Sequence, residues 1–281
     1  MGISHLTAGT IKTGFSPALA AYKRTIHKDQ HTRNSKKAVF TVNSLLDTIR
    51  PVPDRSILLG RCTDDLPFLL EFGDPNLGAI LIGSEMGHGK THQLQVMVES
   101  AMATIPAHKL QVAILTLNTE EWGRFSDSSP DKKYLQGLFA WYDPAAEQLI
   151  ATLTDLAEKR RDGLWTGADI LFILDDLSAV GDLGCEAQVN LRWLLEYGTQ
   201  SGIWVVAAID AQRAISMRYW IDPFRTRIVG KVTGGELTDI LSSRLDVITA
   251  DLAPAEFKVW TGDTWLKYTL PLLGGLKAKE V

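Results

Sequence analysis

The residues with the clearest chemical capacity are the glycines, the lysine and the threonine of one short loop. Residues 83–91 read Gly-Ser-Glu-Met-Gly-His-Gly-Lys-Thr, after an apolar run at 79–82 and before a helix-like segment. Glycines let backbone N–H groups turn inward around an anion, the lysine meets β- and γ-phosphates, and the hydroxyl suits Mg²⁺. Because a helix N-terminus also attracts anions, this order of strand, loop and helix predicts a cradle for a nucleoside triphosphate.

The predicted nucleotide-binding residues belong to this loop and to the first turn after it. The usual pattern has glycine six residues before the lysine, whereas this chain has Ser84 there and glycine one step earlier. Glu85 and His88 are expected to face outward, because a carboxylate beside a triphosphate is repelled. The full predicted set is Ser84, Gly87, His88, Gly89, Lys90, Thr91 and His92. Lys90 is also expected to act in catalysis, and Thr91 to bind the metal.

A second motif supplies paired carboxylates. Residues 171–176 form an apolar run that ends in Asp175 and Asp176, as a buried parallel strand does when it delivers acids at its carboxyl end. Asp175 is predicted to hold Mg²⁺, and Asp176 to polarise the attacking water. Asp176 stands where glutamate is usual and is one methylene shorter, so slow turnover is expected. Glu120 and Glu121 follow another apolar strand, and either one assists water activation or both belong to an ordinary polar loop.

The elements that must position these groups alternate in type. Apolar runs separated by helix-like stretches predict a mostly parallel sheet with crossover helices, an α/β fold. The clearest helix begins at Asp143-Pro144, with Asp143 as N-cap, and ends in the basic turn 158–161. Residues 256–260 and 264–269 flank Thr-Gly-Asp and predict a β-hairpin at the sheet margin. The apolar runs lie at 56–59, 67–72, 79–82, 111–116, 170–174, 203–209 and 227–232.

The N-terminal part of the chain differs in charge from the rest. Residues 1–53 read as a basic extension or linker that ends at Pro51-Val52-Pro53, and residues 54–281 as one domain. Residues 1–40 carry seven basic residues against one acid, a charge of +6 that leaves −10 for the remainder of a chain whose total is −4. Such an arm either touches nucleic acid or lies in water or on a partner.

Bulk composition excludes few classes. The chain has 281 residues, 45% hydrophobic and 22% charged, which is ordinary for a globular protein. No apolar run approaches 18 residues and no charged-then-apolar leader is present, so neither a membrane span nor a secretory signal is expected. Cys62 and Cys185 have no metal-ligand spacing, which fits a reducing compartment. We expect a cytoplasmic protein.

Several segments together resemble the FtsK/HerA family of RecA-like P-loop ATPases. The likeness spans roughly residues 55 to 270, with the phosphate loop as its most specific part. The segments are the lead-in hairpin at 57–72, the strand and loop at 79–91, the helix and acid strand at 153–177, the Gly-Ile strand with its Gln-Arg pair at 202–213, and the Thr-Arg-Ile strand at 225–232.

The resemblance implies a RecA-like core, ATP and Mg²⁺ as cofactors, and a homo-oligomeric, hexameric ring. Gln212 resembles the sensor residue beside the γ-phosphate. A ring ATPase also needs an arginine from the neighbouring subunit. Thr199 stands where many DNA-pumping relatives carry an arginine, so the candidates for that role are Arg192, Arg213, Arg225 and Arg227, with Arg227 preferred.

The resulting expectation is a ring motor that hydrolyses ATP and translocates double-stranded DNA in partition, conjugation or packaging, with a protein partner that recruits it. The alternative is a coupling or assembly ATPase of a protein secretion or scaffold complex, with slow hydrolysis, which Asp176 and Thr199 favour. A third interpretation is a monomeric small-molecule kinase or GTPase with the same loop, although no base-recognition motif or lid sequence is evident.

Overall fold

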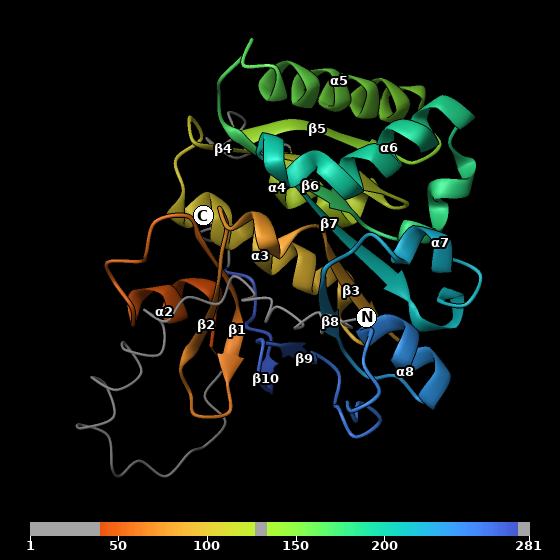
Figure 1. The fold of residues 1–281 in the computed structure, drawn as a ribbon. Helices are drawn as coiled ribbons and strands as arrows, with labels where there is room; N and C mark the ends of the chain where they lie inside the picture. The colour runs from red at the N-terminus through yellow and green to blue at the C-terminus, as the bar shows by residue number, and fades with distance from the viewer. Residues whose placement is uncertain (1–39, 127–133, 275–281) are drawn as a thin grey trace, which may run out of the picture.

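The computed structural model describes residues 40–126 and 134–274. In these residues one ten-stranded sheet has the order β2-β1-β10-β9-β8-β3-β7-β6-β4-β5 (Figure 1). The strands are β1 (Ser56–Cys62), β2 (Pro67–Glu71), β3 (Ile80–Ser84), β4 (Leu110–Thr116), β5 (Leu135–Ala140), β6 (Asp169–Leu174), β7 (Ile203–Asp210), β8 (Thr226–Val229), β9 (Glu256–Trp260) and β10 (Trp265–Thr269). The predicted α/β class is confirmed, and each predicted apolar run contains or overlaps a strand.

The sheet has a parallel half and an antiparallel half. Strands β8, β3, β7, β6, β4 and β5 pair in parallel, so their carboxyl ends meet at one edge. Strands β9, β10, β1 and β2 continue the sheet in antiparallel pairs from β8. Strand β7 lies between β3 and β6, so its carboxyl end separates the phosphate loop from the paired acids.

Helices cover both faces of the parallel half. Side chains alternate along β3, so Leu81 joins the core under α5 (Pro144–Arg161), α6 (Cys185–Tyr197) and α8 (Gly235–Ser242). Ile80 and Ile82 join the other core, which α3 (Lys90–Thr104) covers. Shorter elements complete the fold: α2 (Val42–Asp47), α4 (Gly123–Ser126) and α7 (Arg218–Ile221), with 3₁₀ turns η1 (Pro75–Leu77), η2 (Thr119–Trp122), η4 (Leu177–Asp182), η5 (Gly198–Ser201) and η6 (Ala211–Arg213).

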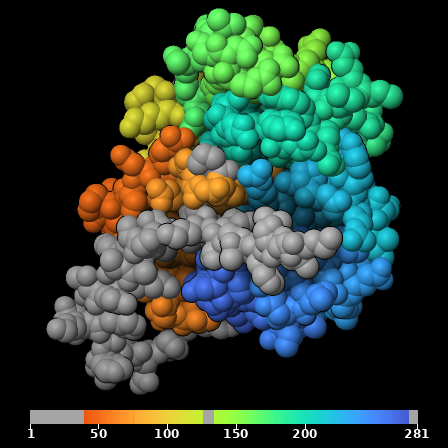
Figure 2. Space-filling view, in the orientation of Figure 1, coloured from red at the N-terminus to blue at the C-terminus, as the bar shows by residue number. Residues whose placement is uncertain are grey.

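The start of the described chain packs on the same core. Helix α2 buries its apolar side against β1 and α3, and the Val42 N–H donates to the Leu272 carbonyl at 3.0 Å. In the space-filling view the red-orange atoms of this region lie at the left of the molecule, beside the orange atoms of the segments that follow (Figure 2). Residues 40–53, predicted as part of an extension, therefore belong to the folded body, while residues 1–39 of the predicted basic arm at 1–40 lie outside the described residues.

Two local predictions had different outcomes. Asp143 caps α5 as expected, accepting a hydrogen bond from the Ala145 N–H at 2.9 Å. The hairpin of β9 and β10 forms, but it lies between β8 and β1 inside the sheet, and the margin is occupied by β2. Its side chains are needed there because Phe257 and Tyr268 fill the core beneath α3. Among the described helices none has the length and apolar character needed to cross a bilayer.

Candidate functional site

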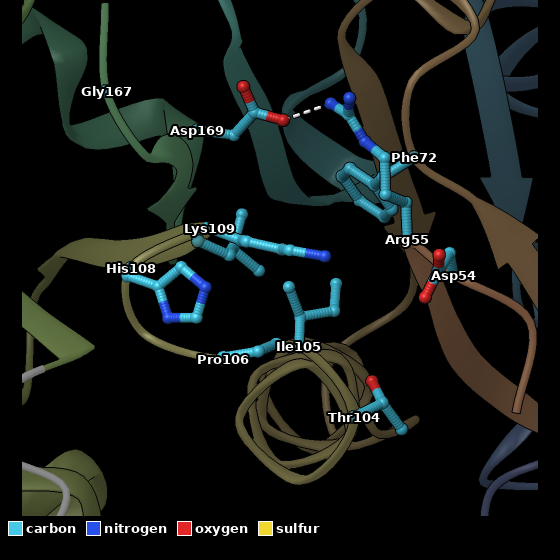
Figure 3. A pocket seen from close by; sticks show the side chains of 11 residues that line it. Asp54, Arg55, Phe72, Thr104, Ile105, Pro106, His108, Lys109, Gly167 and Asp169 are labelled. Carbon is cyan, nitrogen blue, oxygen red and sulfur yellow. Dashed lines mark hydrogen bonds and ion pairs between the residues drawn. The ribbon is translucent and has the colours of Figure 1, made fainter.

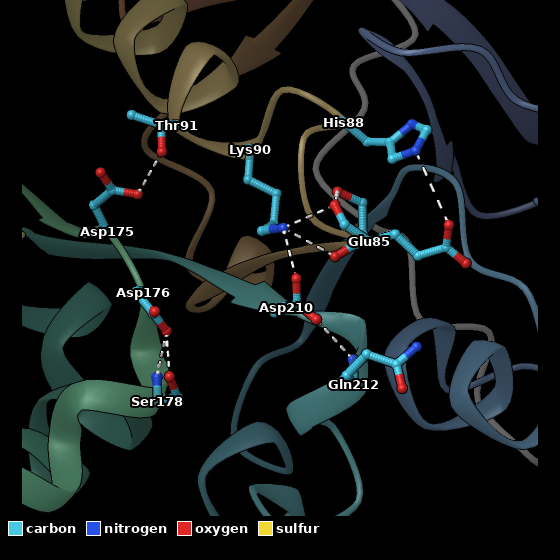
Figure 4. Close-up of polar contacts among 10 residues, drawn as sticks. Glu85, His88, Lys90, Thr91, Asp175, Asp176, Ser178, Asp210 and Gln212 are labelled. Carbon is cyan, nitrogen blue, oxygen red and sulfur yellow. Dashed lines mark hydrogen bonds and ion pairs between the residues drawn. The ribbon is translucent and has the colours of Figure 1, made fainter. Parts of the chain in front are cut away.

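The glycine loop joins β3 to α3 at the carboxyl edge of the parallel half (Figure 4). Gly87 and Gly89 have φ angles of 76° and 93°, a left-handed conformation that glycine adopts without steric cost. A Cβ on Gly87 would meet nothing within 4 Å, so the backbone there is open to close approach. Helix α3 begins at Lys90, and the N–H groups of its first turn have no intrahelical acceptors. The loop therefore fits a phosphate group.

Lys90 lies at the base of this loop. Its ammonium group donates to the carbonyl oxygens of Ser84 (3.0 Å) and Glu85 (2.9 Å), and it pairs with Asp210 Oδ2 at 3.4 Å. The side chain is 15% exposed, and desolvation lowers the pKa of its ammonium group, while Asp210 opposes that shift. The charge is thus held at the point where the loop turns into the helix.

Thr91, in the first turn of α3, and Asp175, directly after β6, lie beside each other (Figure 4). The Thr91 hydroxyl donates to Asp175 Oδ1 at 2.9 Å, and Asp175 Oδ2 accepts from Trp122 Nε1 at 3.0 Å and from the Thr116 hydroxyl at 3.3 Å. Burial raises the pKa of the Asp175 carboxyl, and these hydrogen bonds oppose the rise. A hydroxyl beside a carboxylate is a set of hard oxygen ligands that suits Mg²⁺. The predicted metal residues therefore lie together.

The Asp176 side chain also caps a 3₁₀ turn. Its φ angle is 71°, and its side chain caps η4 by accepting from the Ser178 N–H at 3.0 Å and from the Ser178 hydroxyl. Since both bonds use Oδ1, half of the carboxylate is engaged in holding the turn. The water-polarising role of Asp176 stays a prediction, with only Oδ2 available for it.

Asp210 is a site residue that the sequence analysis missed. Strand β7 runs through Asp210, which pairs with Lys90 and caps η6 by accepting from the Gln212 N–H at 2.9 Å. Gln212, the predicted sensor, follows in that 3₁₀ turn and is exposed. The available signal was the position of Asp210 as the first polar residue after an apolar strand. The side chain that faces the phosphate loop from β7 is therefore that of Asp210.

The two glutamates after β4 differ in their relation to the metal carboxylate. Glu120 and Glu121 both lie in the exposed turn η2. The charge of Glu121 acts on Asp175 and helps to raise the pKa of that carboxyl. Glu121 also accepts a hydrogen bond from the Asn118 side chain at 3.1 Å. Glu120 remains a candidate for water activation, and Glu121 is the one with an electrostatic link to Asp175.

The side chains of His88, in the loop, and His92, in α3, both lie near other groups of the chain. His92 Nε2 lies 2.7 Å from the Pro271 carbonyl oxygen. His88 Nε2 lies 4.0 Å from Glu85 Oε2, and Glu85 Oε1 accepts from the Thr233 N–H at 2.6 Å. That hydrogen bond is the main cause of a lowered pKa of the Glu85 carboxyl. The nucleotide-binding role of His88 and His92 stays a prediction.

Arg227 occupies a position that does not fit a role in a neighbouring subunit. It is 8% exposed, and its guanidinium donates to the carbonyl oxygens of Phe224 (2.7 Å), Ile221 (2.8 Å), Ile240 (3.2 Å) and Leu241 (3.4 Å). Burial lowers the pKa of Arg227 to about 10. Because its donors are committed to its own chain, the preference for Arg227 as the trans arginine is corrected.

The remaining candidate arginines are distributed differently. Arg192 is bonded to Glu196 at 2.6 Å and to the Tyr219 carbonyl. Arg213 and Arg225 are exposed. Exposure is what a residue needs to reach another subunit, so these two are now the stronger candidates for the trans role.

A separate cavity of about 350 Å³ lies at the opposite edge of the sheet (Figure 3). The amino ends of β1, β4 and β6 border it, and an ion pair between Arg55 and Asp169 crosses one side. His108 and Lys109 form part of its wall. It contains none of the predicted nucleotide-binding residues, so the chemistry of the site follows from the loop and the acids at the carboxyl edge.

This arrangement of strand, glycine loop, lysine and acid on the next strand but one defines the P-loop class of nucleotide-binding fold. The sequence matches no protein-family model and no curated protein. Solved structures of ATPases share the fold at 12 to 16% identity, so the predicted resemblance is confirmed for the fold.

Three solved structures illustrate the likeness. Thermomonospora curvata EccC (ATPases 2 and 3), in complex with a signal sequence peptide, has a TM-score of 0.67 and 15% identity, over 92% of this chain and 48% of that one. EssC (ATPases 2 and 3) from Geobacillus thermodenitrificans has a TM-score of 0.64 and 12% identity, over 91% and 49%. The pCW3 conjugation coupling protein TcpA with ATPγS has a TM-score of 0.56 and 16% identity, over 78% and 66%. The chain thus spans about half the length of the first two.

Proposed function

We propose that this chain binds ATP with Mg²⁺ at the carboxyl edge of its parallel strands and hydrolyses it as one subunit of a homo-oligomeric, hexameric ring. The observation that carries the proposal is the pairing of Thr91 with Asp175 at the edge where the phosphate loop holds Lys90. The loop N–H groups would bind phosphate oxygens, and Lys90 would neutralise charge on the γ-phosphoryl group. Thr91 and Asp175 would hold the metal, which supplies further neutralisation of that charge when bound.

Hydrolysis requires a group that orients water. Water adds to the γ-phosphorus, the bond to the β–γ bridging oxygen breaks, and the proton of the water passes to a base or to the phosphate. Asp176 is the proposed orienting group, with Glu120 as a second candidate. Since Asp176 is also bonded to Ser178, we expect slow turnover.

We propose double-stranded DNA as the polymer that the ring moves. The basic residues of the arm at 1–40 support this, because clustered cations bind phosphate backbones. A coupling or assembly ATPase in protein secretion is the second candidate, and the engagement of Asp176 with Ser178 favours it. Among the neighbours, EccC is a type VII secretion ATPase and TcpA a conjugation coupling protein.

The rate of ATP hydrolysis with and without double-stranded DNA tests these proposals. A stimulation of several-fold supports the DNA motor, whereas indifference to DNA supports the coupling ATPase. Lys90→Ala is the matched negative control, because the charge of Lys90 serves the ligand and the variant should still fold. If the folded wild-type chain neither binds nor hydrolyses ATP at millimolar concentration, the proposed function is wrong.

A further inference from the structure

All three N–H donors of the Lys90 ammonium group are used within the chain. A lysine ammonium carries three protons, and three acceptors of the same chain receive them: Glu85 O, Ser84 O and Asp210 Oδ2. A phosphate oxygen that binds this ammonium must therefore replace at least one of these acceptors. The affinity for a triphosphate depends on which acceptor is replaced and on the free energy lost when its contact with Lys90 is broken.

Asp210 differs from the other two acceptors. The carbonyl oxygens belong to the loop itself and carry no net charge, whereas Asp210 is a carboxylate from another strand. Its contact is also the longest of the three, at 3.4 Å. The sheet fixes its position, because Asp210 stands directly beside Ser84 in the parallel register of β3 and β7. A negative charge is thus fixed next to Ser84, the last residue of β3.

We infer that Asp210 sets the nucleotide affinity of this site: its carboxylate holds the Lys90 ammonium and must release it when a nucleoside triphosphate binds. This inference rests on the proposed function. Two effects weaken binding together, since the ion pair is lost and the freed carboxylate repels the phosphates. A neutral side chain of the same shape removes both effects, so it should bind the triphosphate more tightly.

Asp210→Asn tests the inference, because the amide keeps an oxygen that can cap η6 while the charge is removed. Isothermal titration with ATPγS and Mg²⁺ should give a Kd roughly five- to tenfold lower than that of the wild type, the scale of a partly buried ion pair. Asp143→Asn is the matched control. Asp143 also follows a parallel strand and caps a helix through the N–H two residues on, but Lys90 does not bond to it.

A second measurement does not involve nucleotide. The rate at which acetic anhydride acetylates Lys90, followed by mass spectrometry on the purified chain, should rise several-fold in Asp210→Asn and stay at the wild-type rate in Asp143→Asn. If Asp210→Asn fails to fold, Asp210→Ser replaces it, because serine also caps helical turns and carries no charge.

The outcomes separate this inference from the function on which it rests. Tighter ATPγS binding together with faster acetylation supports the affinity-setting role of Asp210. Unchanged or weaker binding in Asp210→Asn overturns that role and leaves ATP binding by the wild type intact. If neither the wild type nor Asp210→Asn binds ATPγS at millimolar concentration, the proposed function fails and the inference fails with it.

Discussion

The two halves of the sheet contribute different things to the candidate site. In the parallel half, strands β3, β6 and β7 end at one edge, and the residues after or at those ends supply the side chains Lys90, Asp175 and Asp210. The segments that flank the antiparallel strands supply mainly support. Lys231 O accepts from the Glu85 N–H at 2.9 Å, and the Ala255 N–H donates to His88 O at 3.2 Å.

The parallel half therefore supplies the side chains expected to bind the ligand, and the other half supports the loop. Parallel strands bring their carboxyl ends to a common edge, so a sequence of alternating strands and helices gathers polar side chains there. The segments after β8 and before β9 hold the loop through backbone hydrogen bonds, which do not depend on a particular side chain. Substitutions in the first half should therefore change ligand binding, and substitutions in the second half should change stability.

The strongest test is Arg227, which lies in β8 at the border of the two halves. Arg227→Met removes a charged donor from four carbonyl oxygens, of which the Ile221 oxygen keeps the Phe224 N–H, so we expect a loss of unfolding free energy on the order of 3 to 5 kcal/mol. Urea denaturation measures it, and the exposed Arg225→Met is the control, with an expected change within about 0.5 kcal/mol. A stable Arg227→Met variant whose subunits impair wild-type ATPase in mixed rings would return Arg227 to the trans role.

The same substitution in each half sharpens the comparison further. Gly60→Ala in β1 would place a Cβ 2.5 Å from the Thr269 carbonyl oxygen of β10, so the strands must separate at a cost of roughly 1 to 3 kcal/mol. Gly87→Ala meets no atom and loses roughly 1 to 2 kcal/mol through its φ of 76°. Thermal unfolding should show the larger loss for Gly60→Ala, and ATPγS titration the weaker binding for Gly87→Ala. Equal ATPγS affinity of the two variants would contradict the assignment of ligand binding to the parallel half and of stability to the antiparallel half.

Asp175→Asn should separate stability from metal binding within the parallel half. Burial raises the pKa of the Asp175 carboxyl above 3.8, so the folded state holds this proton more tightly than the unfolded state. The wild type therefore loses stability as pH rises through that raised pKa. At pH 7 and without nucleotide or Mg²⁺, the neutral amide should gain roughly 1 kcal/mol over the wild type.

Unfolding free energies of the wild type and Asp175→Asn at a series of pH values measure this effect. The advantage of the variant should shrink as pH falls through the raised pKa of Asp175, because the wild-type carboxyl then becomes protonated. Mg²⁺ should stabilise the ATPγS complex of the wild type and have little effect on the variant. An advantage that is independent of pH would show that desolvation of Asp175 is not its cause.

The sequence predicted the parallel half well, and for a physical reason. Buried parallel strands read as continuous apolar runs, so residues 79–82 and 170–174 identified β3 and β6 together with the polar residues after them. Asp143-Pro144 marked the start of α5 because capping is local. These features depend on neighbours in the sequence, so one chain is enough to find them.

The features that were missed depend on contacts between distant segments. Strand β5 is an edge strand with a glycine at its centre, so it lacks a continuous apolar run. Gln212 was assigned instead of Asp210 because the end of β7 is fixed by its register with β3. The burial of Arg227 depends on α8 carbonyls, and the interior place of the β9–β10 hairpin depends on its pairing with β1. None of these pairings follows from local residue patterns.

The smallest expected effect concerns the contact between Glu85 and the segment after β8. Glu85 Oε1 accepts from the Thr233 N–H at 2.6 Å, and this bond lowers the pKa of the carboxyl below 4.5. A depressed folded-state pKa contributes stability above the unfolded value, and that contribution is lost as pH falls through the folded value. Glu85→Ala should therefore cost a net of roughly 0.5 to 1 kcal/mol at pH 7.

The two-state unfolding free energy of Glu85→Ala, compared with the wild type at pH 7 and near pH 3, measures the contact. The difference should narrow as pH falls through the lowered pKa of Glu85, because a protonated carboxyl accepts less strongly. Glu85→Gln keeps an acceptor oxygen and should lie between the two. Because this contact supports the loop and holds no phosphate, ATPγS affinity should fall less than in Gly87→Ala. A larger fall would mean that Glu85 contributes to ligand binding as well as to the stability of the loop.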